Sequence, residues 1–223
     1  MLTLQGKRVY ETLEELVHPQ HTAVLVIDMQ NESCSEGGLY AGLDLSLYDS
    51  VIPRIHELLD AARRNGIPVF HTQTVVMRED LSPAHLRRLW ILHRRKYGNA
   101  TPRLAEVDFS PPDSFDADFV DGLRPADGDI VIRKFRPSAF AGTRLDLLLR
   151  SNGIETLVIT GVVTEGCVDS TAREAHSLNY YAVIIVDAVA SDDRELHEAA
   201  LKTMQVYYET PSVKEVLAAW ESL

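Results

Sequence analysis

The sequence predicts an α/β fold, a three-layer α/β/α sandwich around a mostly parallel, six-stranded, Rossmann-like sheet. Two observations support this expectation. Short runs rich in valine, isoleucine and threonine are bounded by glycine, and longer segments with apolar residues at helical spacing lie between them. Strands that alternate with helices along a whole chain are typical of a parallel sheet with helices on both faces.

The strongest strand signal is residues 154–160, IETLVIT, which run into Gly161. A mostly apolar run of this length is typical of a central, buried strand. After a polar N-terminal segment we expect strands at residues 21–28, 67–72, 129–133, 154–160, 181–186 and 207–209. We expect helices at residues 50–65, 83–96, 144–150, 167–178 and 194–206, and a last helix after residue 211. Pro53 would lie in the first turn of the first helix, where proline is tolerated.

A long insertion separates the second and third predicted strands. We expect one domain over residues 1–223, with this insertion at about residues 73–127. It holds the helix at 83–96 and a stretch rich in proline and aspartate. Insertions of this length usually serve as lids or contact arms, and the sequence leaves both roles open.

The amino-acid composition excludes some classes of binding partner. The chain has 22 Lys and Arg against 33 Asp and Glu, a formal net charge of −11. Such a field repels phosphate backbones and anionic membrane surfaces, so we expect neither nucleic acid nor a membrane as a partner. The two cysteines do not make a disulfide framework, and no apolar run reaches about 18 residues. A cytoplasmic protein with reduced thiols is the simplest expectation.

Three chemically apt residues follow predicted strands. Asp28 ends the first strand, Lys134 the third, and Cys167 begins the helix after the fourth. In open α/β sheets, ligands bind outside the carboxyl ends of the strands, so these residues should meet at one edge. Together they supply a base, a cation and a nucleophile. A helix start should also stabilise the thiolate of Cys167.

These residues lie in three motifs, VLVIDMQN, IRKFRPSAF and VITGVVTEGCVDSTAREA. In this order and spacing they resemble the isochorismatase-like cysteine hydrolases, which include nicotinamidases, N-carbamoylsarcosine amidases and ureidoacrylate amidohydrolases. The resemblance implies that Asp28 is the general base, Lys134 the catalytic lysine and Cys167 the nucleophile. It also implies a cis peptide at Val162–Val163 and an oxyanion hole formed by the backbone N–H groups of Val163 and Cys167.

The implied function is that of a cysteine-dependent amidohydrolase, which cleaves a C–N bond of a small linear amide, carbamoyl or ureido compound through a thioester. The finer similarity is to the amidohydrolases of small ureido or carbamoyl compounds. A non-catalytic binding or scaffold protein on the same fold, and a hydrolase of a cyclic amide or ester, remain open as alternatives.

The resemblance also bears on cofactors and assembly. Nicotinamidases hold a metal with an Asp-x-His motif, but the segment HTQTVVMRED after the second strand lacks it. We therefore expect no metal and no other cofactor. Because hydrolases of this group generally assemble, we expect a homo-oligomer, a dimer or a tetramer.

Further side chains are candidates for other roles. Loops at the same sheet edge offer candidate substrate contacts, with loop packing as the equal alternative: Asn31, Gln73, Phe135, Phe140 and Thr164. We expect a structural ion pair for Arg173 and no role in the chemistry for Cys34. Because an anion beside the nucleophile would raise the pKa of the thiol, we expect Glu165 to turn outward, to solvent or to a neighbouring subunit.

Overall fold

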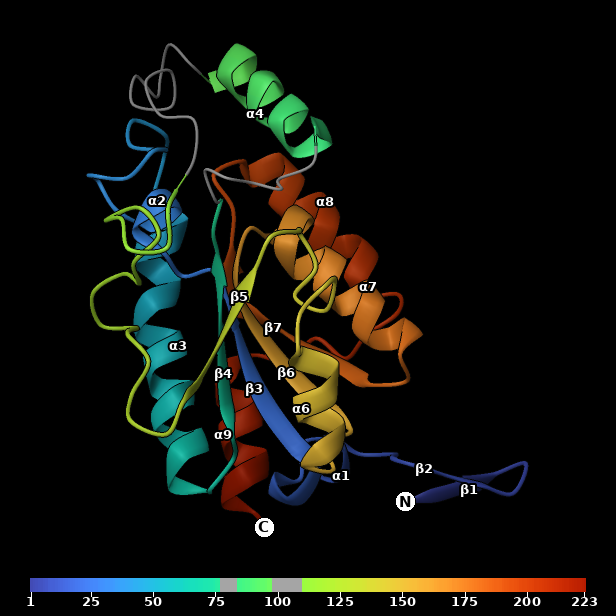
Figure 1. Ribbon diagram of the computed structural model, residues 1–223. Coiled ribbons are helices and arrows are strands. Elements are labelled where there is room, and N and C mark those ends of the chain that lie inside the picture. The colour runs from blue at the N-terminus through green and yellow to red at the C-terminus, as the bar shows by residue number, and fades with distance from the viewer. Residues whose placement is uncertain (77–83, 98–109) are drawn as a thin grey trace.

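The computed structural model describes residues 1–76, 84–97 and 110–223, and it has the predicted α/β fold (Figure 1). Its main sheet has five parallel strands in the order β5-β4-β3-β6-β7. The strands are β3 (Thr22–Ile27), β4 (Val69–Thr74), β5 (Ile130–Lys134), β6 (Thr156–Val162) and β7 (Tyr181–Ala190).

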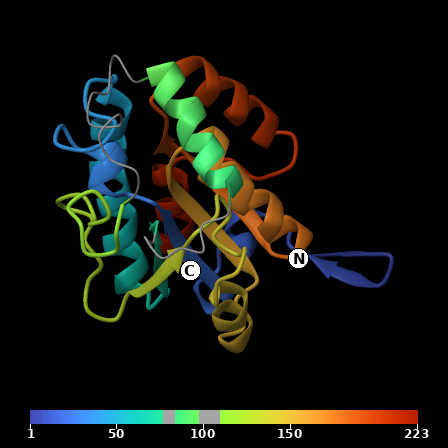
Figure 2. The same ribbon diagram turned by 45° about the horizontal axis from the view of Figure 1, so that its top comes forward.

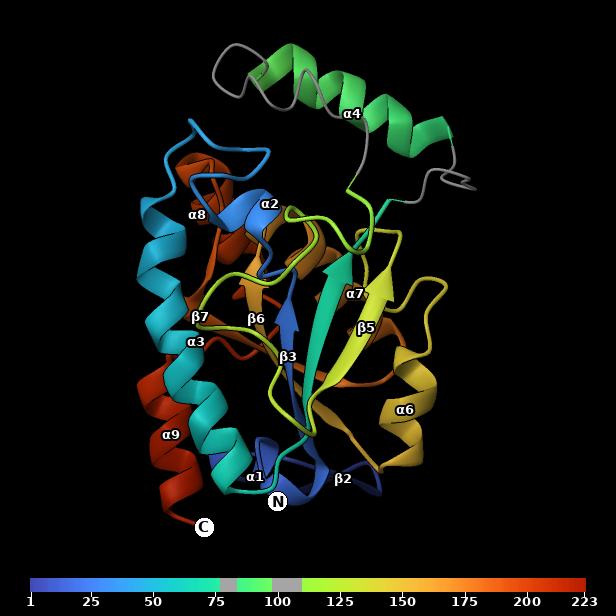
Figure 3. The same cartoon turned by 60° about the vertical axis from the view of Figure 1, so that its left-hand side comes forward.

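Helices cover both faces of this sheet (Figures 1 and 3). One face packs against α1 (Leu13–Leu16), α3 (Ser46–Arg64) and α9 (Val213–Glu221), and the other against α6 (Leu145–Ser151), α7 (Asp169–Ser177) and α8 (Arg194–Met204). Strand β3 shows why helices must cover both faces of the sheet. Val24 and Val26 point into the first core, while Leu25 and Ile27 point into the second. The strand is therefore buried along its whole length, as a central parallel strand should be.

The edges of the fold differ from expectation. The predicted sixth strand at 207–209 is reduced to a single parallel bridge between Glu209 and Val183. The polar N-terminal segment instead forms an antiparallel hairpin of β1 (Leu2–Leu4) and β2 (Lys7–Val9), which was not predicted. This hairpin is exposed and projects from the body of the protein (Figure 2). A 3₁₀ turn, η1 (Pro19–His21), leads from α1 into β3.

Helix α3 begins at Ser46 rather than near residue 50, so the placement of Pro53 in its first turn is wrong. Pro53 lies inside the helix and cannot donate a backbone hydrogen bond to the Asp49 carbonyl. It is exposed, so water can satisfy that carbonyl and the helix continues to Arg64.

Two further helices lie near the carboxyl ends of the strands. Helix α2 (Asn31–Cys34) follows β3 directly, and α4 (Ala84–Tyr97) crosses over this end of the sheet (Figures 1 and 3). The helix predicted at 83–96 is thus present from Ala84, and residues 77–83 and 98–109 of the insertion lie outside the described residues. No helix in the described ranges combines the length and the apolar composition needed to cross a bilayer.

Candidate active site

The sheet topology brings the three predicted catalytic residues to one edge. From β3 the chain adds β4 and β5 on one side, then returns to place β6 and β7 on the other. The crevice at such a reversal is where ligands bind in open α/β sheets. Asp28 directly follows β3, Lys134 is the last residue of β5, and Cys167 lies in the π-helical turn η2 (Thr164–Val168) between β6 and α7.

Asp28 is held by two threonines of β4. Its φ of 48° places it in the left-handed region, which aspartate tolerates better than most residues. Its backbone N–H donates to Thr72 Oγ1 at 3.1 Å, and the Thr72 hydroxyl donates to Oδ1 at 2.6 Å. Thr74 Oγ1 donates to Oδ2 at 2.9 Å. The carboxylate is therefore fixed on both oxygens before any substrate binds.

Gly161 lets β6 approach β3 closely below the site. Its φ is +107°, and a Cβ atom there would lie 2.1 Å from the backbone oxygen of Ile27. The pairing of β6 with β7 also shifts register between Ile159 and Gly161. Glycine at this position is what allows the end of β6 to lie beside Asp28 and to lead into η2.

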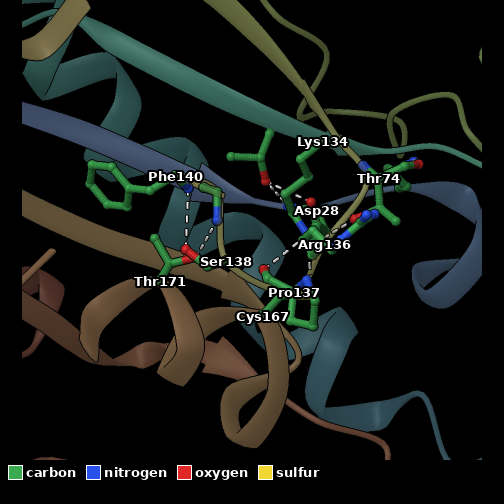
Figure 4. A network of polar contacts seen from close by, with 12 residues as sticks. Asp28, Thr74, Lys134, Arg136, Pro137, Ser138, Phe140, Cys167 and Thr171 are labelled. Carbon is green, nitrogen blue, oxygen red and sulfur yellow. Dashed lines mark hydrogen bonds and ion pairs between the residues drawn. The ribbon is translucent and has the colours of Figure 1, made fainter. Parts of the chain in front are cut away.

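Lys134 joins the other two groups (Figure 4). Its Nζ lies 2.7 Å from Asp28 Oδ2 and 3.3 Å from Cys167 Sγ, and it also donates to the backbone oxygens of Arg136 (3.0 Å) and Pro137 (3.1 Å). The side chain is completely buried. Burial alone would lower the pKa of Lys134, but Asp28 and then Cys167 outweigh it and raise the pKa, so the group stays an ammonium ion.

The electrostatics of Cys167 correct the expectation of a stabilised thiolate. The pKa of Cys167 is raised to about 12, because burial of the sulfur and the charge of Asp28 together outweigh the opposite effect of Lys134. Cys167 also lies within η2, before α7 begins at Asp169, rather than at the start of a regular α-helix. Cys167 is therefore a thiol beside a carboxylate that can accept its proton.

A cavity of about 690 Å³ opens beside these groups. Its lining includes Asp28, Lys134, Phe135, Val163, Glu165 and Cys167. Phe135 is the predicted substrate contact that the structure places in this lining. The expectation that Glu165 turns outward is wrong, because this residue faces the cavity and accepts a hydrogen bond from Ser191 Oγ at 2.9 Å.

The structure places the other four predicted contacts in supporting positions outside that lining. Asn31 Nδ2 and Gln73 Nε2 donate to the backbone oxygens of Phe115 and Ala117 in the segment beside α2. Phe140 is buried and stacks on Tyr180, with ring centroids 5.7 Å apart. The buried Thr164 hydroxyl pairs with His197 Nδ1 at 2.8 Å. Their contact with a substrate stays a prediction.

The structure also identifies lining residues that the sequence did not single out. Glu32, Tyr40 and Tyr48 line the cavity from the segment after β3, and His93 lines it from α4. Tyr40 Oη and His93 Nδ1 lie 2.8 Å apart, so α4 is attached to the wall of the cavity. Nothing local marks these residues, because their roles depend on contacts between distant segments.

The threonines that hold Asp28 did leave a local signal. They lie two residues apart in HTQT at the end of β4, and alternate residues of a strand share a face.

Three smaller expectations have direct outcomes. The Val162–Val163 peptide is cis, as the resemblance implies. Arg173 Nε donates to Asp169 Oδ2 at 2.8 Å, which confirms its ion pair. Cys34 is buried in the core and is not part of the cavity lining. Among the described residues, no group of three or more His, Cys, Asp or Glu side chains could hold a metal ion.

This site and fold define a class of α/β proteins in which a carboxylate, an ammonium and a thiol meet at the carboxyl edge of a parallel sheet. Residues 22–217 match the family model of the isochorismatase domain, so the chain belongs to the isochorismatase family. The resemblance found in the sequence motifs is thereby confirmed.

Relatives of known name agree with this assignment. Ureidoacrylate amidohydrolase RutB of Pantoea ananatis is 37% identical over 195 residues, with 85% of this chain and 78% of that protein covered. The RutB protein of Pseudomonas syringae pv. syringae is 34% identical over 201 residues, with 85% and 79% covered.

Solved structures are similar as well. N-carbamoylsarcosine amidase from Thermoplasma acidophilum is 26% identical with a TM-score of 0.64, and 86% of this chain and 96% of that chain are covered. Nicotinamidase PncA from Bacillus subtilis is 26% identical with a TM-score of 0.68, with 86% and 99% covered. The three-layer fold predicted from the sequence is therefore that of the family.

Proposed function

We propose that this chain is a cysteine amidohydrolase that cleaves a C–N bond of a small linear amide, carbamoyl or ureido compound, with Asp28, Lys134 and Cys167 as its catalytic triad. The observation that carries the proposal is the position of the Lys134 ammonium, 2.7 Å from the carboxylate and 3.3 Å from the sulfur, beside an open cavity. A base, a cation and a nucleophile thus meet where a substrate can enter.

The first half of the reaction forms a thioester. Asp28 takes the proton of the Cys167 thiol as the sulfur attacks the substrate carbonyl. The resulting oxyanion accepts hydrogen bonds from the backbone N–H groups of Val163 and Cys167, and each such donor typically contributes about 3 kcal/mol. Asp28 then gives its proton to the leaving nitrogen, and the C–N bond breaks.

The second half restores the enzyme. Water attacks the thioester carbonyl while Asp28 takes a proton from it, the C–S bond breaks, and the proton returns to the sulfur. Lys134 remains protonated throughout, because it stabilises first the carboxylate and then the developing thiolate. A raised thiol pKa in the resting state fits this cycle, because the proton leaves the sulfur only when the attack begins.

The names of the relatives support the choice of reaction. They are amidohydrolases, which confirms the expectation of a hydrolase for carbon–nitrogen bonds other than peptide bonds. A ureido or carbamoyl compound is the substrate class that RutB and N-carbamoylsarcosine amidase have in common by name. A scaffold protein without activity would have no need of a solvent-accessible cavity beside a carboxylate, an ammonium and a thiol.

The decisive experiment replaces the nucleophile. Cys167→Ala and Cys167→Ser should reduce the release of ammonia or amine from ureidoacrylate and simple carboxamides to background, while the far-UV circular dichroism stays unchanged. Cys34→Ala is the matched control, because this second cysteine is buried away from the cavity and its loss should leave turnover intact. A Cys167→Ala variant with the wild-type rate would rule out the covalent mechanism.

We further propose that the protein acts in the cytoplasm, as a homo-oligomer, and without a metal or other cofactor. Free thiols at both cysteines fit a reducing compartment. Helix α4 has three exposed apolar side chains, Leu89, Ile91 and Leu92, which fit a contact between subunits; Leu89 and Ile91 also line the cavity, so such a contact would lie at its mouth. Light scattering should give a multiple of 24.9 kDa, and EDTA should leave turnover unchanged. A monomer in scattering, or activity lost to EDTA and restored by Zn²⁺, would contradict these proposals.

A further inference from the structure

The carboxyl group of Glu32 faces the catalytic cavity but has no part in the triad. Glu32 lies on α2, four residues after Asp28, and lines the same cavity as Asp28, Lys134 and Cys167. The charges of Asp28 and Lys134 both act on it, so it lies on the catalytic side of the cavity. Glu165, in contrast, is influenced by Asp192 and Asp193 near α8.

The backbone around Glu32 is held firmly. Its N–H donates to the Asp116 carbonyl at 2.8 Å, and the N–H of Asn31 donates to the Asp118 carbonyl at 2.8 Å. Gly38 packs so closely on α2 that a Cβ atom there would lie 2.5 Å from the Glu32 carbonyl oxygen. A side chain that projects from such a fixed backbone is well suited to position a ligand.

The partly buried Glu32 carboxyl group has few polar partners among the described residues. One oxygen, Oε2, accepts a hydrogen bond from Ser110 Oγ at 3.0 Å. Within residues 1–76, 84–97 and 110–223, no lysine or arginine forms an ion pair with it. Lys134 lowers the pKa of Glu32 but forms no ion pair with it, because its Nζ lies among Asp28, Cys167 and two backbone carbonyls. The Glu32 carboxyl group is thus a partly buried acceptor with one hydrogen-bond donor among the described residues, and such a group in a cavity wall suits a ligand that donates hydrogen bonds.

A ureido or carbamoyl group is such a ligand. When its carbonyl oxygen lies in the oxyanion hole, its N–H groups point away from that hole and need acceptors. We propose that Glu32 is a specificity-determining residue, which accepts hydrogen bonds from the N–H groups of a bound ureido or carbamoyl substrate. This inference rests on the proposed amidohydrolase function. It adds the residue that would make the enzyme prefer substrates with N–H groups over esters.

The test compares two substrates that differ in N–H groups. Ureidoacrylate carries N–H donors on both sides of its reacting carbonyl, whereas p-nitrophenyl acetate is an ester with none. The assays are run at about pH 8.5, where Glu32, with a pKa of about 7, is ionised. Glu32→Gln should then lower kcat/KM for ureidoacrylate about 10- to 100-fold, because hydrogen bonds to a charged acceptor are stronger than those to a neutral one. Hydrolysis of the ester should stay within about twofold of wild type, since the triad is untouched.

Two further variants serve as controls. Glu32→Asp keeps the charge but withdraws it by one methylene, and should lose part of the ureidoacrylate activity. Glu36→Gln removes an exposed carboxylate just beyond the same helix and should change neither substrate. The ester activity also reports that each variant is folded.

The outcomes separate this inference from the function on which it rests. Equal losses on both substrates in Glu32→Gln, or no loss on ureidoacrylate, would overturn the role of Glu32 and leave the amidohydrolase intact. If the wild-type protein cleaves none of ureidoacrylate, N-carbamoylsarcosine and a simple carboxamide, the proposed function is wrong. The inference about Glu32 then loses its basis as well.

Discussion

The charge of Asp28 has two opposite effects on Cys167. As a carboxylate next to the sulfur it raises the pKa of the thiol, which keeps the resting nucleophile protonated. In the proposed mechanism it is also the base that removes the thiol proton during attack. Reactivity toward a general alkylating agent and catalytic turnover therefore depend on this residue in different ways.

Asp28→Asn should separate these two effects. Turnover should fall about 10²- to 10⁴-fold, because the general base is lost. The alkylation of Cys167 by iodoacetamide should shift to lower pH, because the neutral amide no longer opposes the thiolate. The measurement is the alkylation rate between pH 6 and 10 in a Cys34→Ala background, where Cys167 is the remaining thiol. A shift of the profile to higher pH would show that the carboxylate does not oppose ionisation.

At the scale of elements, the pairing between strands β3 and β6, here called the β3–β6 seam, positions the site. These strands pair over six residues, from Thr22 with Thr156 to Ile27 with Gly161. The pairing ends at Gly161, where the close approach to Ile27 leaves no room for a side chain. The spacing between Asp28 and the η2 turn is therefore set by the backbone of this seam.

Gly161→Ala should destabilise the fold by about 2–3 kcal/mol, through the clash with Ile27 and the positive φ together. Gly153→Ala is the matched control. Gly153 also has a positive φ, +67°, but a Cβ atom there would have nothing within 4 Å, so this variant should lose only about 1 kcal/mol. Urea unfolding measures the loss of stability in both variants, provided that their m-values match that of the wild type. Equal losses would mean that backbone conformation alone accounts for the effect.

Sequence patterns predicted most helices and strands. They also predicted which three residues meet at the site, but not the direction of the loop side chains around it. The strand ends that carry Asp28, Lys134 and Cys167 follow from apolar runs and topology, because parallel strands present their carboxyl ends to one edge. The direction of a loop side chain does not follow from such patterns. Glu165 was expected outside and faces the cavity. Asn31 was expected either at the substrate or in loop packing, and its amide donates to the Phe115 carbonyl, while its contact with a substrate stays a prediction.

At the scale of the whole molecule, buried titratable groups make the free energy of unfolding depend on pH. Some of these groups favour the folded state at high pH and others at low pH. Burial lowers the pKa of four histidines: His21, His71, His93 and His197. Each binds a proton more readily when unfolded, so its contribution is present above pH 6.5 and is lost as the pH falls below that value. Glu32 acts in the opposite sense. Burial raises its pKa to about 7, so its contribution is present below about pH 4.5 and is lost as the pH rises through 7.

We predict that the free energy of unfolding decreases as the pH is lowered from 7 to 5. His71 is the most buried contributor, and its Nε2 lies 3.1 Å from Asp129 Oδ2. His71→Gln should reduce the slope in this range, whatever it does to the stability at pH 8. Urea midpoints measured at half-unit steps of pH provide the test, and an unaltered slope in the variant would contradict the assignment to His71.

The three groups of the proposed triad lie at or after strand ends that are far apart in the chain, so no short fragment can contain them all. Enzymatic activity is consequently a late event in refolding: it can return only after the central strands have found one another over long sequence distances. Regain of turnover after dilution from denaturant should then lag behind the regain of helical circular dichroism. A simple assay would in this way follow the step at which the chain acquires its native topology.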